Sequence, residues 1–313
     1  MKAIVLQKAG GVENLRFTDL EKPEISASEV LVEVKAISIN PVDYKIRSEE
    51  QGINMMFGEG RPVLLGWDIA GTVVSKGEKA NQFEIGDRVF GMVNFPGAGN
   101  AYAEFVAAPE THLAKIPANI SFEEAAASTL AALTALQVLQ GRIKKDDRVL
   151  IHAGSGGVGH FAIQIAKSMG AYVISTSSAK NRDFILSLGA DEHIDYRTQK
   201  FEEVVNDIDF VLDGMGGEVL MNSVKVMRKG GSIISLPTPP PVIEEAQELA
   251  GGNVSVSKLM VQSNGKDMET LATLLKDGTV KAHVSKTFPF VDMALAHNEI
   301  ESGRTVGKIV VTL

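Results

Sequence analysis

Gly154-Ser155-Gly156-Gly157-Val158-Gly159 is the stretch of sequence that decides the fold. It follows an apolar run at 148–153 and leads into residues 158–169, whose apolar side chains recur with the period of a helix. Between a strand and a helix, the first glycine permits a tight turn, the second lets a pyrophosphate approach the backbone, and the third lets the helix pack closely on the strand. The stretch therefore predicts a dinucleotide-binding loop, and a glycine turn without a ligand is the alternative.

Residues downstream of this loop alternate between strand and helix patterns. We predict strands at 148–153, 171–176, 193–194, 209–213, 232–236 and 254–261, and helices at 158–169, 181–188 and 217–227. Strands that alternate with helices form a doubly wound parallel sheet, so this part of the chain has the α/β pattern of a Rossmann domain. The proline cluster at 237–241 is expected to interrupt the pattern.

Residues upstream of position 120 show short apolar segments separated by Gly, Pro and Asp. They predict strands at 3–6, 29–38, 71–75, 87–92 and 102–107. These strands are expected to form a compact, mostly antiparallel β domain. Ser121 and Glu124 then form a capping-box pattern, which predicts that a helix begins here and covers 122–140.

The C-terminal tail changes character once more. From about residue 279 it is strand-like, and it ends in a predicted strand at 308–313. A terminal strand after a nucleotide-binding domain suggests that the chain returns to pair with its first domain. The expected domains are therefore residues 1–121 together with 279–313, and residues 122–278.

Composition excludes several classes of protein. The 313 residues are 44% hydrophobic and 22% charged, as in soluble globular proteins, and the net charge of −8 argues against nucleic acid or a membrane as the main partner. Without any cysteine, the chain has no disulfide, cysteine nucleophile or thiolate zinc site. The six histidines show no metal-binding pair spacing, so no metal is expected. No signal peptide or membrane span is evident, and a cytoplasmic location is the default expectation.

The choice of cofactor is made after the second predicted strand, about 20 residues beyond the start of the glycine loop. NAD-binding sites place an acidic residue there, which holds the ribose hydroxyls. This chain has no acidic residue between Thr176 and Asp183, and the predicted helix carries Asp183 away. Ser177 and Lys180 can instead donate hydrogen bonds to a 2′-phosphate, which predicts NADP(H). The alternative is that Lys180 and Arg182 are solvated residues at the start of a helix.

The whole chain resembles the medium-chain dehydrogenase/reductases, in their quinone oxidoreductase and enone reductase branch. The landmarks that carry the resemblance lie, in this order, at 38–45, 65–71, 86–89, 133–135, 153–159, 188–191 and 303–308. The resemblance implies a GroES-like, mostly β substrate domain built from the N-terminal part and the tail, together with a Rossmann domain. It also implies a homodimer, paired through the predicted strand at 254–261.

The sequence departs from the zinc-dependent members of that family. Asn40 stands where those members have a zinc-ligating cysteine, Trp67 and Asp68 stand where they have a His-Glu pair, and their four-cysteine lobe is missing. Alcohol dehydrogenation by their route needs the metal to polarise the oxygen, so the resemblance implies a zinc-free enzyme. Hydride transfer without zinc requires an electrophilic small-molecule substrate, such as a quinone or an α,β-unsaturated carbonyl compound. The pocket must then donate hydrogen bonds to the oxygen that gains charge.

Three side chains can donate such bonds from the segment that lines the substrate pocket in relatives. The resemblance assigns this role to Asn40 and Lys45, and Tyr44 is a further candidate that could instead pack in the first domain. Lysine at position 45 is similar to the enone reductases, whereas many quinone reductases have tyrosine there, which favours enones or enals. A surface lysine is the alternative for Lys45. Trp67 and Phe57 are candidates for an apolar substrate cleft, with core packing as the alternative.

The resemblance also implies which residues contact the cofactor. Thr134 is expected near the nicotinamide ring, and Leu236 and Thr238 are expected beside its carboxamide. Tyr196 and Lys180 are expected at the adenosine 2′-phosphate. Arg304 could reach the cofactor or the substrate, or lie on the surface near a turn. The phosphate loop contributes Gly154, Ser155, Gly156, Gly157, Val158 and Gly159.

Two other hypotheses compete with this one. Tyr196 and Lys200 match the YxxxK pattern of short-chain reductases, but that family carries its glycine motif near the N-terminus, so we interpret the match as coincidental. The second is a non-enzymatic protein that kept the NADPH-binding fold and lost turnover. The intact glycine loop, Asn40 and Lys45 favour an enzyme.

Overall fold

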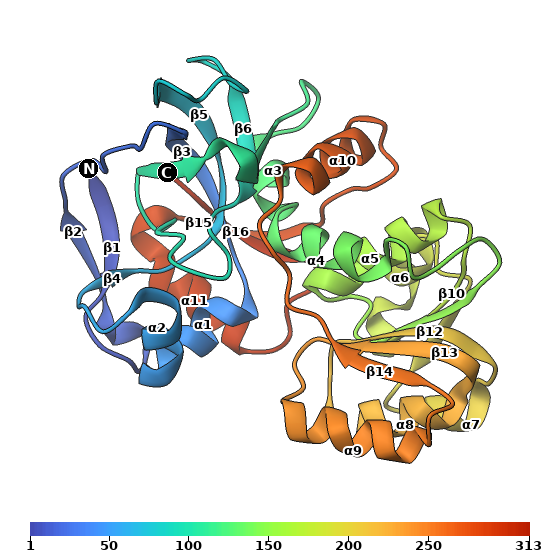
Figure 1. Cartoon of the computed structure of the whole chain (residues 1–313). Helices are drawn as coiled ribbons and strands as arrows, with labels where there is room; N and C mark the ends of the chain where they lie inside the picture. Colours follow the sequence, from blue (N-terminus) through green and yellow to red (C-terminus); the bar gives the residue numbers. More distant parts are fainter. The chain divides into compact units, whose positions relative to one another are not determined.

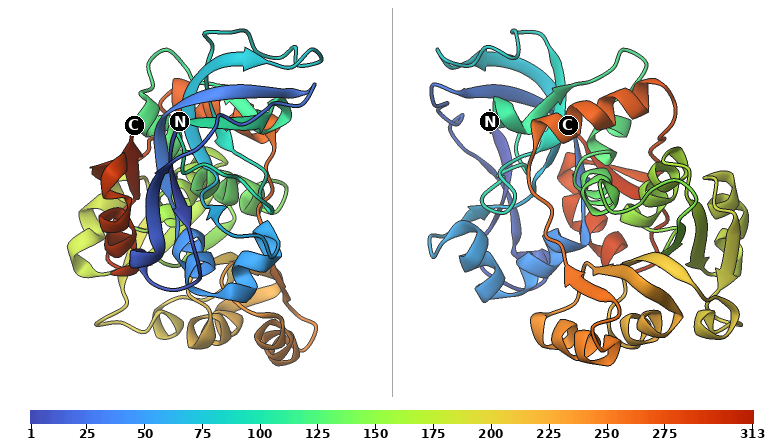
Figure 2. Two further views of the ribbon diagram at one scale, coloured as in Figure 1. Left: turned by 90° about the vertical axis from the view of Figure 1, so that its left-hand side faces the viewer. Right: turned by 45° about the vertical axis from the view of Figure 1, so that its right-hand side comes forward.

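Two units make up the chain, and the computed structural model describes all 313 residues. Unit 1 comprises Met1–Leu133 and Val261–Leu313, and unit 2 comprises Thr134–Met260, so both ends of the chain lie in unit 1 (Figure 2). The first boundary lies later in the chain than the sequence pattern indicated, and the second lies earlier. The reason is that two helices, α3 (Phe122–Ala127) and α10 (Gly265–Lys276), pack on strands of unit 1.

A six-stranded parallel sheet forms the centre of unit 2. Its strands are β9 (Arg148–Ile151), β10 (Tyr172–Ser177), β11 (Glu192–Asp195), β12 (Ile208–Asp213), β13 (Met227–Ser235) and β14 (Ser255–Lys258). Their order is β11-β10-β9-β12-β13-β14, which is the order of a Rossmann fold with its reversal between β9 and β12. Val149, Leu150 and Ile151 are fully buried, as expected for a strand with both faces covered. The predicted doubly wound sheet is confirmed.

Helices cover both faces of this sheet (Figure 1). One face carries α5 (Gly157–Ser168) and α6 (Arg182–Ser187), and the other carries α7 (Phe201–Val204), α8 (Gly217–Val226) and α9 (Pro240–Ala250). The proline cluster was expected to interrupt the pattern, but α9 begins inside it. Proline is tolerated in the first turn of a helix, where its missing N–H has no intrahelical role, so Pro240 and Pro241 start the helix.

Unit 1 contains two sheets. The larger has the order β15-β16-β3-β5-β6-β8, with β7 also paired to β3, and the smaller has the order β2-β1-β4. The strands are β1 (Lys2–Leu6), β2 (Leu15–Asp19), β3 (Glu29–Ile39), β4 (Val63–Leu64), β5 (Asp68–Lys76), β6 (Arg88–Met92), β7 (Phe105–Pro109), β8 (Leu113–Lys115), β15 (Val284–Pro289) and β16 (Lys308–Thr312). Only β15 and β16 pair in parallel, so the predicted antiparallel β domain is confirmed. The predicted strand at 102–107 lies slightly further along the chain, as β7.

The last strand, β16, confirms that the chain returns to its first domain. It pairs with β3, with Ile309 opposite Ile39, and lies between β3 and β15 in the sheet (Figure 1). The tail as a whole is not strand-like, because α11 (Met293–Glu301) separates the two strands. Met293 and Ala296 are buried three residues apart on this helix, which is helical rather than strand spacing.

The helix predicted at 122–140 is broken into α3 and α4 (Leu130–Leu139). At the break, the Ser128 hydroxyl donates to the Glu124 carbonyl at 2.7 Å, and such bonds compete with the backbone bonds of a helix. The Asp68 carboxylate accepts the first N–H of α4 at 3.0 Å and so caps a new helix. Long-range contacts therefore end a helix that local pattern would continue.

Two short helices that the sequence did not predict follow β3. They are α1 (Pro41–Ser48) and α2 (Glu50–Phe57), and α1 begins with Pro41 directly after Asn40.

No helix of the chain combines the length and the apolar character that crossing a bilayer requires.

Candidate active site

The strand order of unit 1 brings three polar side chains to one end of its larger sheet. β3 lies between β16 and β5. Asn40 directly follows β3, Asp68 is the first residue of β5, and Lys308 is the first residue of β16. Because β5 and β16 both run antiparallel to β3, the starts of these two strands lie beside the end of β3.

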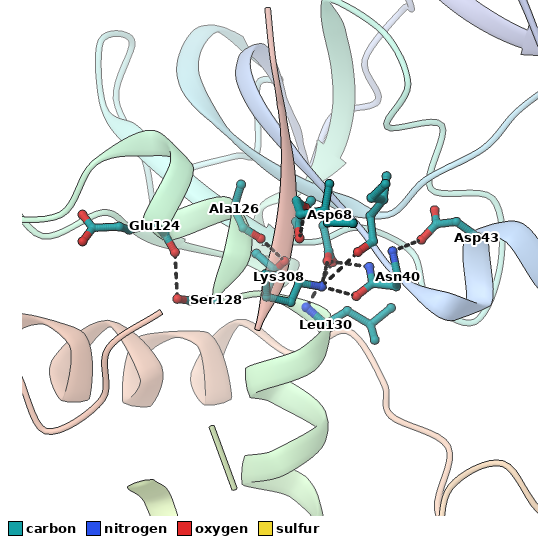
Figure 3. A network of polar contacts seen from close by, with 12 residues as sticks. Asn40, Asp43, Asp68, Glu124, Ala126, Ser128, Leu130 and Lys308 are labelled. Atoms are coloured by element: carbon teal, nitrogen blue, oxygen red, sulfur yellow. Dashed lines mark hydrogen bonds and ion pairs between the residues drawn. The ribbon is translucent and has the colours of Figure 1, made fainter. Parts of the chain in front are cut away.

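Hydrogen bonds join these three side chains, as Figure 3 shows. Lys308 Nζ donates to Asn40 Oδ1, and at 3.2 Å to the backbone oxygen of Ile39. Asn40 Nδ2 donates to Asp68 Oδ2 at 2.7 Å. Asn40 is 1% exposed, and the side chains of Lys308 and Asp68 are 3% and 0% exposed. Each of these three side chains therefore has a hydrogen-bond partner within the protein.

Burial dominates the electrostatics of this cluster. It raises the pKa of Asp68, while the charge of Lys308 and several hydrogen bonds lower that pKa. Burial also lowers the pKa of Lys308, which the charges of Asp68 and Asp43 oppose. The Lys308 Nζ and Asp68 Oδ2 atoms are 4.0 Å apart. Each charge therefore supports the other, and removing either one leaves an uncompensated buried ion.

A second polar chain holds the backbone of Asn40. Asp43 Oδ2 accepts the Asn40 N–H at 2.7 Å, and Asp43 Oδ1 accepts the Tyr102 hydroxyl at 3.0 Å. His297 Nε2 lies 2.9 Å from the Tyr102 hydroxyl, and Arg47 lies 3.1 Å from His297 Nδ1. Arginine can only donate, so His297 is neutral with its hydrogen on Nε2. Every bond in the chain then points toward the Asp43 carboxylate.

Burial shifts the pKa values of the groups in this series of hydrogen bonds. Burial raises the pKa of Asp43 to about 7, and the negative charge of Asp68 adds to the rise. Burial, together with the charge of Arg47, lowers the pKa of His297 to about 3. Arg47 in turn forms an ion pair with Glu301 of α11 at 2.7 Å. Neutral histidine and a readily protonated aspartic acid therefore coexist in one buried chain.

The other predicted substrate-side residues lie on α1, at the end of α2 and just before β5. Lys45 is exposed and Tyr44 is half-buried, and neither side chain has a hydrogen-bond partner in the chain. Trp67 is fully buried and its Nε1 donates to a backbone oxygen at 2.6 Å. Its ring packs against half-buried Phe57 and against Phe95, with centroids 5.8 and 5.2 Å away. Trp67 is thus a core residue, whereas Lys45 and Tyr44 keep free donors.

The glycine loop of unit 2 has the close contacts that its sequence predicts. A Cβ on Gly154 would lie 1.9 Å from a serine hydroxyl of β10, and a Cβ on Gly159 would lie 2.4 Å from the Ala153 oxygen. A Cβ on Gly156 would meet only the Ala153 oxygen, at 3.2 Å, so this side of the loop is open. Helix α5 begins at Gly157, and the first N–H groups of a helix have no intrahelical partner. The loop fits a dinucleotide pyrophosphate.

Ser177, expected at the 2′-phosphate, has its hydroxyl engaged inside the protein. The residue is 3% exposed, and its hydroxyl donates to the Ser178 oxygen at 3.1 Å. His193 Nε2 lies 2.9 Å from the same hydroxyl. The hydroxyl therefore serves the local turn in this structure.

Two exposed side chains and one bridging amide form the rest of that region. Lys180 is exposed, and Tyr196 is 60% exposed. Asn181 Nδ2 donates to the Ser155 hydroxyl at 2.9 Å and so ties the turn after β10 to the glycine loop. Sequence reasoning did not single out Asn181. Asn181 could have been found from its position directly after Lys180, in a turn rich in polar residues.

The residues predicted around the nicotinamide follow β13 or lie on α4. Thr134 is 5% exposed on α4. The Leu236 N–H donates to the Asp213 oxygen at 2.9 Å, and Asp213 Oδ2 accepts the Ser235 hydroxyl at 2.7 Å. That hydroxyl lies 2.5 Å from the Thr238 hydroxyl. These bonds fix the carboxyl ends of β12 and β13, the edge at which Rossmann sheets bind ligands.

Comparisons with known proteins place this geometry in a family. The profile described as alcohol dehydrogenase GroES-like domain matches residues 26–118, and the one described as zinc-binding dehydrogenase matches residues 188–311. The 2-methylene-furan-3-one reductase of Solanum lycopersicum is 33% identical over 99% of this chain and 79% of its own. The chain belongs to the medium-chain dehydrogenase/reductases. Its branch is that of the zinc-independent quinone oxidoreductases and enone reductases.

Further relatives of this oxidoreductase belong to the same branch of the family. The NADPH-dependent alkenal/one oxidoreductase of Arabidopsis thaliana, a chloroplastic protein, is 33% identical over 99% of this chain and 79% of its own. The quinone oxidoreductase of Coxiella burnetii has a TM-score of 0.92 and 34% identity, covering 100% of this chain and 99% of that one. The Escherichia coli quinone oxidoreductase complexed with NADPH has a TM-score of 0.86 and 28% identity, with both chains fully covered, 100% of each.

This oxidoreductase has Asn40 and Trp67 at positions where the resemblance placed zinc ligands in other members. Its chain contains no group of three or more His, Cys, Asp or Glu side chains arranged to hold a metal ion. Arg304, the remaining candidate, is exposed, and its backbone N–H donates to Ser302 Oγ at 3.3 Å.

Sequence reasoning missed the partners of Asn40. Asp68 and Lys308 were noticed only as landmarks, and Asp43 and His297 were given no role. The available signal was a charge at the start of an otherwise apolar strand, as in Lys308-Ile309-Val310-Val311. A charged residue in a buried strand needs a partner, but the sequence does not say which one.

Proposed function

We propose that this oxidoreductase uses NADPH to reduce α,β-unsaturated carbonyl compounds or quinones without zinc, with enones and enals favoured over quinones. The observation that supports this is the side-chain amide of Asn40. It is held in the cluster by hydrogen bonds, and the second hydrogen of Nδ2 has no partner in the chain. A donor held in place stabilises the negative oxygen that forms when hydride adds to such a substrate.

NADPH is the cofactor that the residues of unit 2 fit. When bound, its nicotinamide supplies the hydride. The first turn of α5 binds the pyrophosphate, and the open side of Gly156 admits it. Lys180 and Tyr196 bind the 2′-phosphate, and no carboxylate was found between Thr176 and Asp183 to repel it. The relatives of this oxidoreductase include an NADPH-dependent alkenal/one oxidoreductase and a quinone oxidoreductase complexed with NADPH.

The remaining candidate residues have separate roles in the two units. Lys45 and Tyr44 offer additional donors for the substrate oxygen, since neither side chain has a partner in the chain. Thr134, Leu236 and Thr238 orient the nicotinamide. Lys45 in particular favours enones, because the enone reductases that this chain resembles also have lysine at this position.

Turnover on a panel of substrates tests the proposal. NADPH oxidation is followed by absorbance with quinones, enones, enals and nitroalkenes, and the fastest turnover is expected with enones or enals. Lys45→Ala should lower turnover on enones with NADPH affinity nearly unchanged, whereas Lys79→Ala, an exposed lysine of unit 1, should change neither. NADPH binding without turnover on any compound would instead support the alternative, a binding protein that lost catalysis.

Selectivity between cofactors tests the role of Lys180. A charge-assisted hydrogen bond contributes about 1.5–3 kcal/mol, so Lys180→Ala should weaken NADPH binding about tenfold or more. NADH lacks the 2′-phosphate, and its affinity should stay the same. An equal loss for both cofactors would remove Lys180 from the 2′-phosphate site.

The proposed assembly is a homodimer. It is supported by β14, which pairs only with β13 and therefore leaves one edge of the six-stranded sheet open. An open edge offers unpaired backbone groups to a second strand. Light scattering on purified protein should give twice the mass of the chain, and the mass of a single chain would refute the dimer.

A further inference from the structure

We propose that Lys308 and Asp68 are positioning residues, which fix the amide of Asn40 in the one orientation that leaves an Nδ2 hydrogen for the substrate oxygen. This inference rests on the proposed function, in which Asn40 is the donor. Lys308 Nζ donates to Asn40 Oδ1, and Asn40 Nδ2 donates to Asp68 Oδ2 at 2.7 Å (Figure 3). Neither charged side chain needs to touch the substrate.

The chemistry of the two partners makes the orientation unique. An ammonium group has only donors, and an ionised carboxylate has only acceptors. If the amide of Asn40 turned over, its NH₂ would face the ammonium of Lys308 and its oxygen would face the carboxylate of Asp68. Both hydrogen bonds would become repulsions. Hydroxyl or amide partners, which both donate and accept, would permit either orientation.

The two positioning side chains are themselves held. Lys308 Nζ donates to the Ile39 oxygen at 3.2 Å, and Asp68 Oδ1 accepts the Leu130 N–H at 3.0 Å. Lys308 and Asp68 are almost completely buried and start strands on the two sides of β3. They therefore cannot follow Asn40 if its side chain rotates.

The amide of Asn40 has the right number of hydrogens for this role. Nδ2 carries two hydrogens, and the contact with Asp68 uses one of them. The other has no partner in the chain. The charge of Lys308 on Oδ1 also draws electron density away from Nδ2, and hydrogen bonds linked in this way strengthen one another. The remaining N–H becomes a stronger donor than an isolated amide.

A double-mutant cycle tests whether Lys308 acts through Asn40. Losing one oxyanion donor lowers kcat by about 100-fold or more, so Lys308→Met should cost about that much with the KM for NADPH unchanged. In an Asn40→Ala background, Lys308→Met should lower kcat no further. Lys286→Met, which removes an exposed lysine from neighbouring β15, is the matched control and should leave kcat unchanged.

The cycle separates this inference from the proposed function. If Asn40→Ala leaves turnover unchanged, Asn40 is not the donor and the proposed role of Asn40 fails. If Asn40→Ala lowers turnover but Lys308→Met multiplies that loss, Lys308 acts independently and the positioning role is overturned. Should Lys308→Met fail to fold, the pair Lys308→Met with Asp68→Asn removes both buried charges and takes its place.

A measurement without substrate gives an independent answer. With nitrogen-15 in the asparagines alone, the side-chain amide of Asn40 is the signal missing from Asn40→Asp. Its hydrogen exchange should be slow in the parent and at least about tenfold faster in Lys308→Met or the double variant, because the amide is released. Equal exchange rates would overturn the positioning role even if turnover had fallen.

Discussion

Asp43, a buried carboxylic acid of unit 1, should make the stability of this unit depend on pH. The substitution Asp43→Asn should remove this contribution. Burial raises the pKa of Asp43 from 3.8 to about 7, so between these values the native state keeps a proton that the unfolded chain has released. The stability from this proton is complete below pH 3.8 and is lost as the pH rises through about 7. At about 1.36 kcal/mol for each pKa unit, the loss amounts to about 4 kcal/mol. Asparagine does not titrate, so the variant should gain about this much relative to the parent over that range.

Fluorescence of the single tryptophan makes this measurement specific to unit 1. Trp67 is fully buried there, so urea unfolding followed by its emission at a series of pH values reports on this unit. Asp277→Asn, at an exposed position of the same unit, controls for the loss of one carboxylate. Stability curves of Asp43→Asn and parent that stay parallel from pH 4 to about pH 8 would refute the reasoning, because they would mean that folding does not change the affinity of Asp43 for its proton.

Two further predictions concern glycines and histidine. Gly156→Ala should change the stability of unit 2 by less than about 1 kcal/mol but weaken NADPH binding about tenfold or more, because its methyl meets little protein and occupies the space of the pyrophosphate. Gly159→Ala should instead destabilise unit 2 by about 1–3 kcal/mol, because its Cβ would lie 2.7 Å from the Gly154 Cα, a backbone atom; equal melting temperatures of the two variants would contradict this. His297→Asn removes a group whose pKa falls from 6.5 to about 3 on folding, so unit 1 should lose less stability than the parent as the pH drops through this range. The stability of unit 1 is measured by urea unfolding with the emission of Trp67. A loss of stability at acid pH as large in His297→Asn as in the parent would argue against a neutral His297.

The sequence predicted most of the fold because the strand patterns are local. The apolar run before Gly154 and the spacing of helix α5 needed no long-range information, and the Rossmann order followed from their alternation. The helix at 122–140 was predicted as continuous because its break depends on Asp68, a residue far away in the chain. Helices α1 and α2 are short, and their apolar residues are too few to show a clear period. The cytoplasmic location stays a prediction.

The candidate site was predicted less completely, because its parts meet only after folding. Asn40 could be singled out from the resemblance, but its partner Lys308 lies 268 residues away and starts a strand that pairs beside it. Ser177 had the right type and place for a phosphate contact, yet its hydroxyl turns to His193, which comes from the neighbouring strand β11. Sequence shows which residues carry chemistry, whereas strand pairing decides which of them meet.

The inner position of β16 has a consequence for synthesis of the protein. This strand comes almost last in the sequence, yet it has neighbours on both sides, so the large sheet of unit 1 stays open until residues 308–312 have left the ribosome. The sheet of unit 2 uses only residues within 134–260 and can close earlier. Under the proposed function, a nascent chain at that stage would bind NADPH before Lys308, the partner of Asn40, has been added to the sheet. The cofactor would then bind before the hydrogen bonds that hold Asn40 have formed, and the pairing of β16 with β3 would complete the proposed site.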